Sequence, residues 1–382
     1  MFCMNEINDN LLIHLHVPKT GGTTMRSLVR RQFDRSKIKE IYPHFGMADS
    51  INQIHDMTPE EKTAINCLQG HFVYGVHVYF QRPVQYIAML RDPVEHIIST
   101  YYYIKGDPNH PYYQELTTNN ITLDNFHEWR SQYFTELNNS QTRYMAGVAS
   151  RELLPEDLEA AKKNVREQFA LVGLTERFDE SVFLLNKTLA WNIVTYRSQN
   201  VTAVRPKQKE LPHDLIQRIR ENNKLDVELY NFTVELFNQK IEELEAETKL
   251  ELAKFIQNRK SFDFIYDFGK SMLSEQFIDW IVNVGSCRVY LFGAGEAGKL
   301  AHNVINEMNN RLGLNIEIQA FIDNDPQKWG QYLLGTQVKG VDSIDHSIAD
   351  HIVIASMYAD DIEKQLLEVK IPENKIIFSL IR

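Results

Sequence analysis

Residues 11–30, LLIHLHVPKTGGTTMRSLVR, constrain the fold more than any other stretch of this chain. Residues 11–15 form a short, apolar run that is typical of a buried parallel strand. The pair Gly21-Gly22 follows, and we expect both glycines to adopt backbone conformations that other residues avoid. The residues after them have the apolar spacing of a helix. A strand, a glycine turn and a helix in this order predict an anion-binding loop at a helix N-terminus.

The polar residues of this loop narrow the choice of anion. Lys19 supplies a mobile cation, and Thr20, Thr23 and Thr24 supply hydroxyl groups. A nucleotide triphosphatase loop reads G-x-x-x-x-G-K-[ST], with its lysine after the last glycine. Here the lysine precedes the glycines, which disfavours a nucleotide kinase or triphosphatase. A strand-to-helix turn without a ligand is the alternative that this loop alone leaves open.

Composition sets broad limits on the function. With 382 residues, 43% hydrophobic and 24% charged, the chain is long enough for two domains with ordinary globular cores. The net charge of −10 gives no general attraction to nucleic acid or to an anionic membrane. Three scattered cysteines indicate neither a disulfide framework nor a zinc site. We find no membrane span and no secretory leader in the sequence, and we expect a cytoplasmic protein.

A second strand–turn–helix unit follows at residues 84–105. Residues 84–90 read as a buried strand, and Pro93 suits the first position of a helix. Arg91, at the carboxyl end of that strand, can clamp a phosphate with two hydrogen bonds, and the hydroxyl of Ser99 can add another. The alternative is that Arg91 only pairs with a nearby carboxylate and that Ser99 is an ordinary helix residue.

Together these motifs resemble a known family. The order P-K-T-G-G-T-T resembles the 5′-phosphosulfate loop of sulfotransferases that use 3′-phosphoadenosine 5′-phosphosulfate (PAPS), and R-D-P-x-x-x-x-x-S resembles their 3′-phosphate site. The chain up to about residue 240 is similar to the heparan sulfate and dermatan uronyl 2-O-sulfotransferases, in a bacterial-type soluble form. The similar segments are VPKTGGTT (17–24), GHFVY (70–74), RDPVEHIISTYYY (91–103), NNSQTRYMAG (138–147), LVGLTERFDES (171–181) and NVTAVRP (200–206).

The resemblance implies a fold and a set of cofactor contacts. The expected fold is α/β, with a P-loop-like parallel sheet flanked by helices. The expected cofactor is PAPS, which leaves as the desulfonated product PAP. The residues that the resemblance assigns to cofactor binding are Lys19, Thr20, Gly21, Gly22, Thr23, Thr24, Arg91, Ser99 and Arg205.

His71 is the residue that the resemblance implies as catalytic base. In that family a Gly-His pair between the two phosphate motifs carries the base, and animal members have His-Gly-His where this chain has Gln69-Gly70-His71. Removing a proton from an alcohol needs a base with a pKa near neutrality, which histidine provides. By residue type alone, the rivals for this role are His14, His16, His44, His77 and His96.

The implied reaction is an in-line sulfuryl transfer to a carbohydrate hydroxyl, of class EC 2.8.2. Lys19 and the helix N-terminus would meet the charge that develops on the leaving phosphate. Gln141 and Arg143 are candidate acceptor contacts, although a solvated helix cap explains them equally well. The chemistry requires no metal. The acceptor can be a polysaccharide, an oligosaccharide or a glycolipid, and the sequence does not choose among these or set an oligomeric state.

Between these motifs the pattern is mostly helical. We expect residues 34–66 to be polar and irregular, apart from a helix at 58–66. Helices are expected at 156–170 and 181–191, with a strand at 171–174 between them. Residues 211–260 form a charged helical stretch. We assign 1–240 to the sulfotransferase domain and 241–284 to a helical connector.

Residues 285–382 predict a second, small Rossmann-like α/β domain. Strands are expected at 287–292, 316–322, 351–355 and 375–378, with a helix at 299–308. Gly293, Gly295 and Gly298 form a G-x-G-x-x-G turn, and Asp323 ends the next strand, which is the fingerprint of dinucleotide binding. The module resembles small domains that accompany sugar-modifying enzymes, so its ligand would be NAD or a nucleotide sugar. A structural or oligomerising module is the alternative.

Two functions remain. The first is a PAPS-dependent carbohydrate O-sulfotransferase in polysaccharide biosynthesis. The alternative is a catalytically inactive regulatory protein that binds a nucleotide or nucleotide sugar. The presence of Lys19, His71, Arg91 and Ser99 favours the enzyme.

Overall fold

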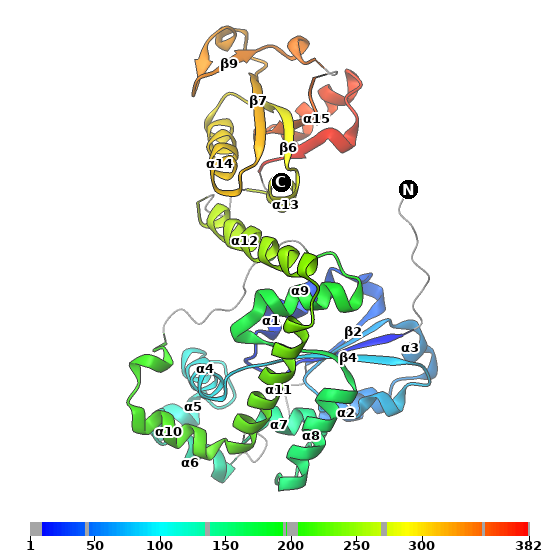
Figure 1. The fold of residues 1–382 in the computed structure, drawn as a ribbon, viewed down its shortest axis with the longest axis vertical. Helices are drawn as coiled ribbons and strands as arrows, with labels where there is room; N and C mark the ends of the chain where they lie inside the picture. The colour runs from blue at the N-terminus through cyan, green and yellow to red at the C-terminus, as the bar shows by residue number, and fades with distance from the viewer. Residues whose placement is uncertain are drawn as a thin grey trace. The chain divides into compact units, whose positions relative to one another are not determined.

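The computed structural model describes residues 10–42, 46–133, 138–193, 196, 205–268, 273–345 and 348–380. The chain divides into two compact units, Met1–Leu252 and Ala253–Arg382. Each unit contains one β-sheet with helices packed on it (Figure 1). Helix α12, Ala246–Phe268, contains the division point. The boundaries at 240 and 284 that the sequence suggests stay predictions.

The first unit is built on a five-stranded sheet in the order β2-β3-β1-β4-β5. All of its pairings are parallel. The strands are β1 Leu11–Leu15, β2 Ile38–Ile41, β3 Cys67–Gly70, β4 Val84–Leu90 and β5 Phe169–Leu174. Every residue of the central strand β1 is buried, which is why that strand is continuously apolar apart from His14.

Helices lie on both faces of this sheet (Figure 1). They are α1 Gly22–Arg30, α2 Gly46–His55, α3 Pro59–Ala64, α4 Pro93–Gly106, α5 Tyr113–Thr118, α6 Phe126–Tyr133, α7 Ser140–Ala146, α8 Pro155–Glu167, α9 Phe178–Leu189, α10 His213–Asn222 and α11 Lys224–Glu242. The fold is therefore α/β with a parallel sheet flanked by helices, which confirms the sequence prediction.

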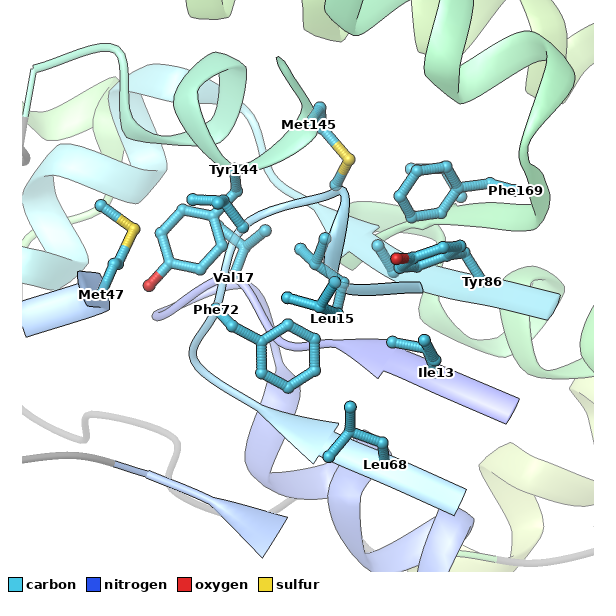
Figure 2. Packing of buried hydrophobic residues seen from close by; sticks show 14 of the residues in the cluster. Ile13, Leu15, Val17, Met47, Leu68, Phe72, Tyr86, Tyr144, Met145 and Phe169 are labelled. Carbon is cyan, nitrogen blue, oxygen red and sulfur yellow. The ribbon is translucent and has the colours of Figure 1, made fainter. Parts of the chain in front are cut away.

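Apolar side chains fix the layers of the first unit. Ile13 and Leu15 of β1 pack with Leu68 of β3 and with Met145 of α7 in one buried cluster (Figure 2). Burying each such side chain stabilises the fold by roughly 1.5–3 kcal/mol. Because alternate residues of a strand face opposite sides of the sheet, the apolar run of β1 serves both layers at once.

Local sequence signals set the start of two helices. Asp92 caps α4: its Oδ1 accepts hydrogen bonds from the backbone N–H groups of Val94 and Glu95, both at 3.0 Å. Pro93 occupies the first turn, as predicted. Thr58 and Glu61 form a reciprocal capping box at the start of α3.

Residues 34–66 are more regular than the sequence indicated. They contain β2 and α2 in addition to α3. The four residues of β2, IKEI, lie at the sheet edge and only Ile41 is fully buried. Such a short edge strand lacks the apolar run that identifies buried strands in sequence. Its pairing with β3 is what makes it a strand.

The second unit has a six-stranded sheet in the order β11-β10-β6-β7-β9-β8. Its strands are β6 Ser286–Phe292, β7 Asn315–Ile322, β8 Tyr332–Leu333, β9 Thr336–Lys339, β10 His351–Ile354 and β11 Ile376–Phe378, and its helices include α13 Glu275–Asn283, α14 Glu296–Leu312 and α15 Ala359–Glu368. The predicted strands are present. The short hairpin of β8 and β9, the one antiparallel pair among the named strands, was not predicted.

Within the part of the chain that the structure describes, every helix is too short or too polar to cross a lipid bilayer.

Candidate active site

The carboxyl edge of the first sheet gathers polar residues from the ends of all five strands, some of which the sequence singled out. His16 follows β1, Tyr42 follows β2, His71 follows β3, Arg91 follows β4 and Thr175 follows β5. Register brings these ends together, since Leu15 pairs with both Gly70 and Ala88. In parallel α/β sheets, ligands bind at this edge.

The glycine loop uses its two glycines for different reasons. Gly21 has a φ of 81°, in the left-handed region that glycine tolerates. Gly22 has no such φ, so the expectation that both glycines need special backbone angles is wrong. A Cβ at Gly22 would lie 1.6 Å from Nε2 of His16, so the small residue leaves room for the imidazole ring. Lys19 also has a positive φ, 64°, which is uncommon outside glycine.

Hydrogen bonds hold the loop in this shape. The hydroxyl of Thr20 donates to the Val17 carbonyl at 2.8 Å. The hydroxyl of Thr175 lies 2.8 Å from the Thr20 carbonyl and 3.0 Å from that of Leu90. The loop is thus tied to the ends of two neighbouring strands. Gly21, the N-cap of α1, offers no side chain to the helix N-terminus, which is where an anion is expected to bind.

Lys19 lies in a cationic and aromatic environment. Its Nζ is 3.7 Å from the centre of the Tyr103 ring on α4. Burial, followed by the charges of Arg91 and Arg205, lowers the pKa of Lys19 to about 8. A bound anion would reverse this effect, because it favours the charged ammonium. Tyr103 was not singled out from the sequence, although its position in the Y-Y-Y run of α4 was the available signal.

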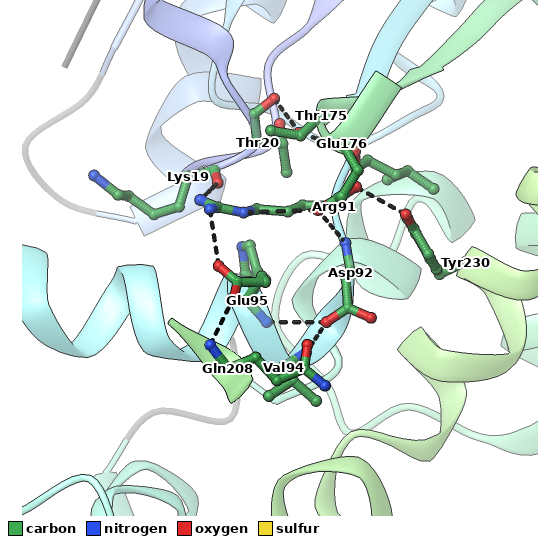
Figure 3. A network of polar contacts seen from close by, with 12 residues as sticks. Lys19, Thr20, Arg91, Asp92, Val94, Glu95, Thr175, Glu176, Gln208 and Tyr230 are labelled. Carbon is green, nitrogen blue, oxygen red and sulfur yellow. Dashed lines mark hydrogen bonds and ion pairs between the residues drawn. The ribbon is translucent and has the colours of Figure 1, made fainter. Parts of the chain in front are cut away.

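Arg91 is held on several sides (Figure 3). Its Nη1 donates to the Lys19 carbonyl at 3.1 Å, and its Nη2 lies 3.3 Å from Oε2 of Glu95. Its Nε lies 3.9 Å from Oε1 of Glu176, a carboxylate that also accepts from Asp92 N–H at 3.0 Å. The guanidinium therefore lies beside the backbone of the glycine loop. The alternative pairing of Arg91 with Glu95 is present, and it is compatible with a phosphate-binding role.

Gln141 fixes the backbone of Arg91. Its Oε1 accepts from Arg91 N–H at 2.8 Å, and its Nε2 donates to the Arg91 carbonyl at 2.9 Å. Asp226 of α11 in turn accepts from Gln141 N–H at 3.2 Å and from Thr142 N–H at 2.7 Å. Burial raises the pKa of Asp226. Gln141 thus holds the backbone of Arg91 in this structure, and its contact with an acceptor stays a prediction.

Arg143 is also turned inward. Only 1% of its surface is exposed, and its Nη1 donates to the Arg151 carbonyl at 2.6 Å. The candidate role of Arg143 in acceptor binding stays a prediction as well.

His71 lies between two rings from other strands. The centres of the His71 and His16 rings are 4.6 Å apart, and those of the His71 and Tyr42 rings are 4.8 Å apart, both edge to face. His16 and Tyr42 are themselves joined by a contact of 3.1 Å between Nδ1 and the hydroxyl. The Nε2 atom of His71 is buried, and no hydrogen-bond partner for it lies among the described residues. Within the described part of the chain, this nitrogen therefore makes no hydrogen bond that would compete with a proton donor.

Burial, with lesser contributions from His14 and Arg26, lowers the pKa of His71 to about 4. The ring is therefore neutral at physiological pH, the protonation state of a base, but its pKa lies well below the near-neutral value expected from the sequence, because the ring is buried. Gly70, next to it, is required for close packing, because a Cβ there would lie 1.9 Å from the Ile41 carbonyl oxygen.

A polar network lies beneath this cluster. His14 is 3.2 Å from Oε1 of Gln69, and Nε2 of Gln69 donates to Glu40 at 2.6 Å. Glu40 is paired with Arg26, whose guanidinium lies 4.1 Å above the Tyr42 ring. Gln69, which replaces the first histidine of the family's His-Gly-His, therefore belongs to the network under the site.

The rival histidines have other surroundings. His14 and His96 are buried, and burial lowers their pKa values to about 4 and about 3. Nε2 of His96 is 2.9 Å from the Pro18 carbonyl oxygen. His77 contacts the Tyr86 hydroxyl at 3.0 Å, and His44 lies outside the described residues.

The remaining predicted cofactor residues lie on α1, on α4 and beside Glu95. Ser99 is buried on α4, two turns after Arg91. Thr23 and Thr24 lie in the first turn of α1. Arg205 lies 2.8 Å from Glu95, and the preceding residues of its sequence motif, 200–204, lie outside the described residues.

The glycine turn of the second unit has a different surrounding. Gly293 has a φ of 118° and lies close to the Ala355 carbonyl, and Gly298 packs on the Gly293 carbonyl. Gly295 has an ordinary φ of −122° and open space where a Cβ would be. The two outer glycines therefore serve close packing, while Gly295 leaves an open approach to the backbone.

Asp323 ends β7 and faces this turn. Its Oδ2 accepts from Ala294 N–H at 2.8 Å and from Nζ of Lys328 at 2.9 Å, and its Oδ1 accepts from Asp325 N–H at 2.9 Å. Burial alone would raise its pKa, but these hydrogen bonds prevail and lower it. The carboxylate is thus engaged by groups of its own unit.

Comparison with known families identifies the first unit. The galactose-3-O-sulfotransferase family matches residues 9–273, and the chain belongs to this sulfotransferase family. A second family, described as C2185-like, N-terminal, matches residues 285–377.

Related proteins point the same way. Heparan-sulfate 6-O-sulfotransferase 2 of Gallus gallus is 27% identical over 62% of this chain and 69% of its own length. Heparan-sulfate 6-O-sulfotransferase 1-A of Danio rerio is 28% identical over 59% of this chain and 64% of its own length. Heparan-sulfate 6-O-sulfotransferase 1 of Homo sapiens is 27% identical over 61% of this chain and 66% of its own length. The chain spans about two thirds of the length of these relatives. The resemblance to PAPS-dependent carbohydrate sulfotransferases is confirmed, whereas the 2-O detail is not.

Among solved structures, a sulfotransferase of Alicyclobacillus acidocaldarius covers 60% of this chain and 96% of its own, with 15% identity and a TM-score of 0.33. A mouse sulfotransferase in complex with PAP covers 56% and 64%, with 12% identity and a TM-score of 0.28.

Several residues of the site were missed by sequence reasoning. Tyr42 lies in no segment that was singled out, whereas Glu95 and Thr175 lie in the similar segments 91–103 and 171–181 but were given no chemical role. Their roles depend on which strand ends and helix turns meet in space, so the sequence offered no direct signal for them.

Proposed function

We propose that this protein is an O-sulfotransferase that moves a sulfuryl group from PAPS to a hydroxyl of a carbohydrate acceptor. One observation carries the proposal: the edge of a single parallel sheet brings together a glycine loop, a phosphate-type arginine and a neutral histidine with an unpartnered, buried Nε2. The names of the matching family and relatives, which specify galactose and heparan sulfate, support a carbohydrate acceptor.

The residues fit a ligand with two separate phosphate groups. The glycine loop and the N-terminus of α1 suit the 5′-phosphosulfate, because backbone N–H groups and the helix dipole favour an anion there. Arg91 follows the neighbouring strand β4, and its guanidinium lies 3.1 Å from the Lys19 carbonyl. This position suits a contact with the 3′-phosphate. When bound, PAPS would supply an activated sulfuryl group on a phosphate leaving group.

In this proposal each residue has one task. His71 accepts the proton of the acceptor hydroxyl at Nε2 while the new oxygen–sulfur bond forms. The old sulfur–oxygen bond breaks, and its electron pair leaves with the phosphate oxygen. The Lys19 ammonium stabilises that charge, and preorganised charges of this kind usually make the largest contribution to lowering such a barrier. His16 and Tyr42 hold the His71 ring in place.

Direct transfer of label tests the proposal. The full chain is incubated with PAPS carrying sulfur-35 and with desulfated heparan sulfate, galactose-terminated oligosaccharides, a glycolipid or a simple phenol. We expect labelled carbohydrate, and we expect PAP to raise the melting temperature, since ligand at a hundred times its Kd stabilises by about 2.7 kcal/mol. No transfer and no response to PAP, together with a response to nucleotide sugars, would instead favour the regulatory alternative.

For the second unit, binding of NAD or a nucleotide sugar stays a prediction. The open backbone at Gly295 is compatible with it. Asp323, which would bind ribose hydroxyls, would have to share hydrogen bonds with Ala294 and Lys328. The same melting experiment includes both ligands.

A further inference from the structure

Glu95, on the first turn of α4, is the carboxylate that contacts two arginines of the proposed cofactor site. Its Oε2 lies 3.3 Å from Nη2 of Arg91 and 2.8 Å from Nη1 of Arg205 (the Arg91 contact is drawn in Figure 3). The three side chains are only 14–19% exposed. Ion pairs at this depth are screened by water less than pairs on the surface.

The cations around Glu95 repel one another. Burial and then the charge of Arg205 lower the pKa of Arg91, and the pKa of Lys19 is lowered by burial and by both arginines. Such a cluster needs an anion to be stable. Glu95 supplies one charge in the protein without a ligand.

A second carboxylate, Glu176, is held mainly by groups other than the arginines. It lies 3.9 Å from Arg91 and is held by Asp92 N–H at 3.0 Å and by the Tyr230 hydroxyl at 2.8 Å. Apart from its two arginine contacts, the Glu95 carboxylate accepts a hydrogen bond from Gln208 N–H at 3.2 Å. Since Glu95 contacts mainly the two guanidiniums, it is the carboxylate that a competing anion would displace.

We infer that Glu95 is an internal stand-in for the 3′-phosphate of the cofactor, displaced from Arg91 and Arg205 when that phosphate binds. This inference rests on the proposed function, because it names the ligand of the same site. A phosphate monoester carries close to two negative charges at neutral pH, against one for a carboxylate, so it wins the competition for two guanidiniums. A nucleotide without a 3′-phosphate does not compete.

The stand-in also acts on a neighbouring segment. Gln208 begins the 3-10 helix η5, Gln208–Glu210, and its N–H donates to Glu95. Displacing the carboxylate releases this contact. Binding of the 3′-phosphate is thereby coupled to the segment that carries Arg205.

The test measures two nucleotides that differ only in the 3′-phosphate. Calorimetry with PAP and with adenosine 5′-monophosphate is performed on the wild-type full chain and on Glu95→Gln. Glutamine keeps the size of the side chain and an acceptor for Gln208 but removes the charge. We expect PAP to bind roughly threefold to tenfold more tightly to Glu95→Gln, in keeping with the energy of a partly exposed ion pair, and the monophosphate to be unchanged within about twofold.

Two further variants calibrate the result. Glu180→Gln removes a carboxylate from a similar pair with Arg177, at 2.6 Å outside the site, and should alter neither affinity. Arg91→Ala should weaken PAP by at least tenfold and the monophosphate much less, since Arg91 also donates to the Lys19 carbonyl of the glycine loop. Thermal melts of each variant confirm folding.

The outcomes separate the inference from the proposed function. If the wild type binds PAP tightly but Glu95→Gln binds it less tightly, or if both nucleotides gain equally, Glu95 only orients the arginines and the inference is overturned. If the wild type shows no preference for PAP over the monophosphate, the placement of the 3′-phosphate site fails, and the proposed function fails with it.

Discussion

The two glycine turns of this protein share a local design and differ in what faces them. Each follows a buried parallel strand, β1 or β6, and each begins a helix, α1 or α14. At the first turn, the residues that directly follow β3, β4 and β5 are His71, Arg91 and Thr175. Beside the second, the facing strand β7 ends in Asp323.

That difference decides what each turn can do. The first turn lies among cations and a neutral histidine, so an anion gains there and a proton can be accepted. At the second, a carboxylate accepts hydrogen bonds from the turn itself and from Lys328. The same strand–turn–helix motif is therefore the proposed anion site in the first unit, whereas in the second unit it is only a candidate binding turn.

The largest expected effect comes from replacing His71, the proposed base beside the first glycine turn. His71→Ala should lower sulfuryl transfer by roughly a hundred- to ten-thousand-fold, the usual contribution of a general base. PAP affinity should stay within a few-fold, because a base acts on the transition state rather than on cofactor binding. Transfer rates and PAP calorimetry on the same preparation measure both.

The matched control is His302→Ala, since His302 is a buried histidine on α14 beside the second turn. It should leave the transfer rate unchanged. Near-native turnover in His71→Ala would mean that another group is the base, or that none is needed.

A smaller effect on stability is expected when one glycine of each turn, Gly22 or Gly295, is replaced by alanine. Gly22→Ala places a Cβ 1.6 Å from Nε2 of His16 and should cost about 1–3 kcal/mol of stability, as overpacking does, and weaken PAP binding. Gly295→Ala meets open space at an ordinary φ and should change stability by no more than about 0.5 kcal/mol. Urea denaturation compares the two variants. Equal losses would contradict the distinction between a packed turn and an open one.

A further effect concerns the stability of the first unit in acid. His14, His71 and His96 have pKa values of about 4, 4 and 3 in the folded first unit, below the ordinary 6.5, because all three are buried. The unfolded chain therefore binds more protons between about pH 6.5 and 4, so stability must fall as pH falls through that range. Each group contributes at most about 1.4 kcal/mol per pH unit.

Hydrogen exchange at pH 7 and pH 5 can follow the amides of β1 and β6 separately. Burial also lowers the pKa values of His302 and His351 in the second unit. These two rings are less buried than those of His14 and His96. Protection should therefore be lost faster in β1, after correction for the intrinsic effect of pH. A steeper loss in β6 would contradict this account.

Local signals in the sequence were enough for most of the fold. The buried runs of β1, β4 and β5 and the Asp92-Pro93 start of α4 predicted their elements because burial and capping leave short-range patterns. The short strand β2 was missed, since it becomes a strand only by pairing with β3 at the sheet edge. The need for glycine at position 22 was misread, because it arises from the ring of His16 rather than from a backbone angle.

The sequence by itself determined the order of the chemical groups: a glycine loop with Lys19, a Gly-His pair and an arginine before a helix. Each of these is a local pattern, so each can be read without knowing the fold. Only the tertiary structure decided that His16 and Tyr42 enclose His71, that Gln141 fixes the backbone of Arg91, and that Glu95 lies between two arginines. These contacts join residues from different strands and helices, and parallel register rather than proximity in sequence places them together.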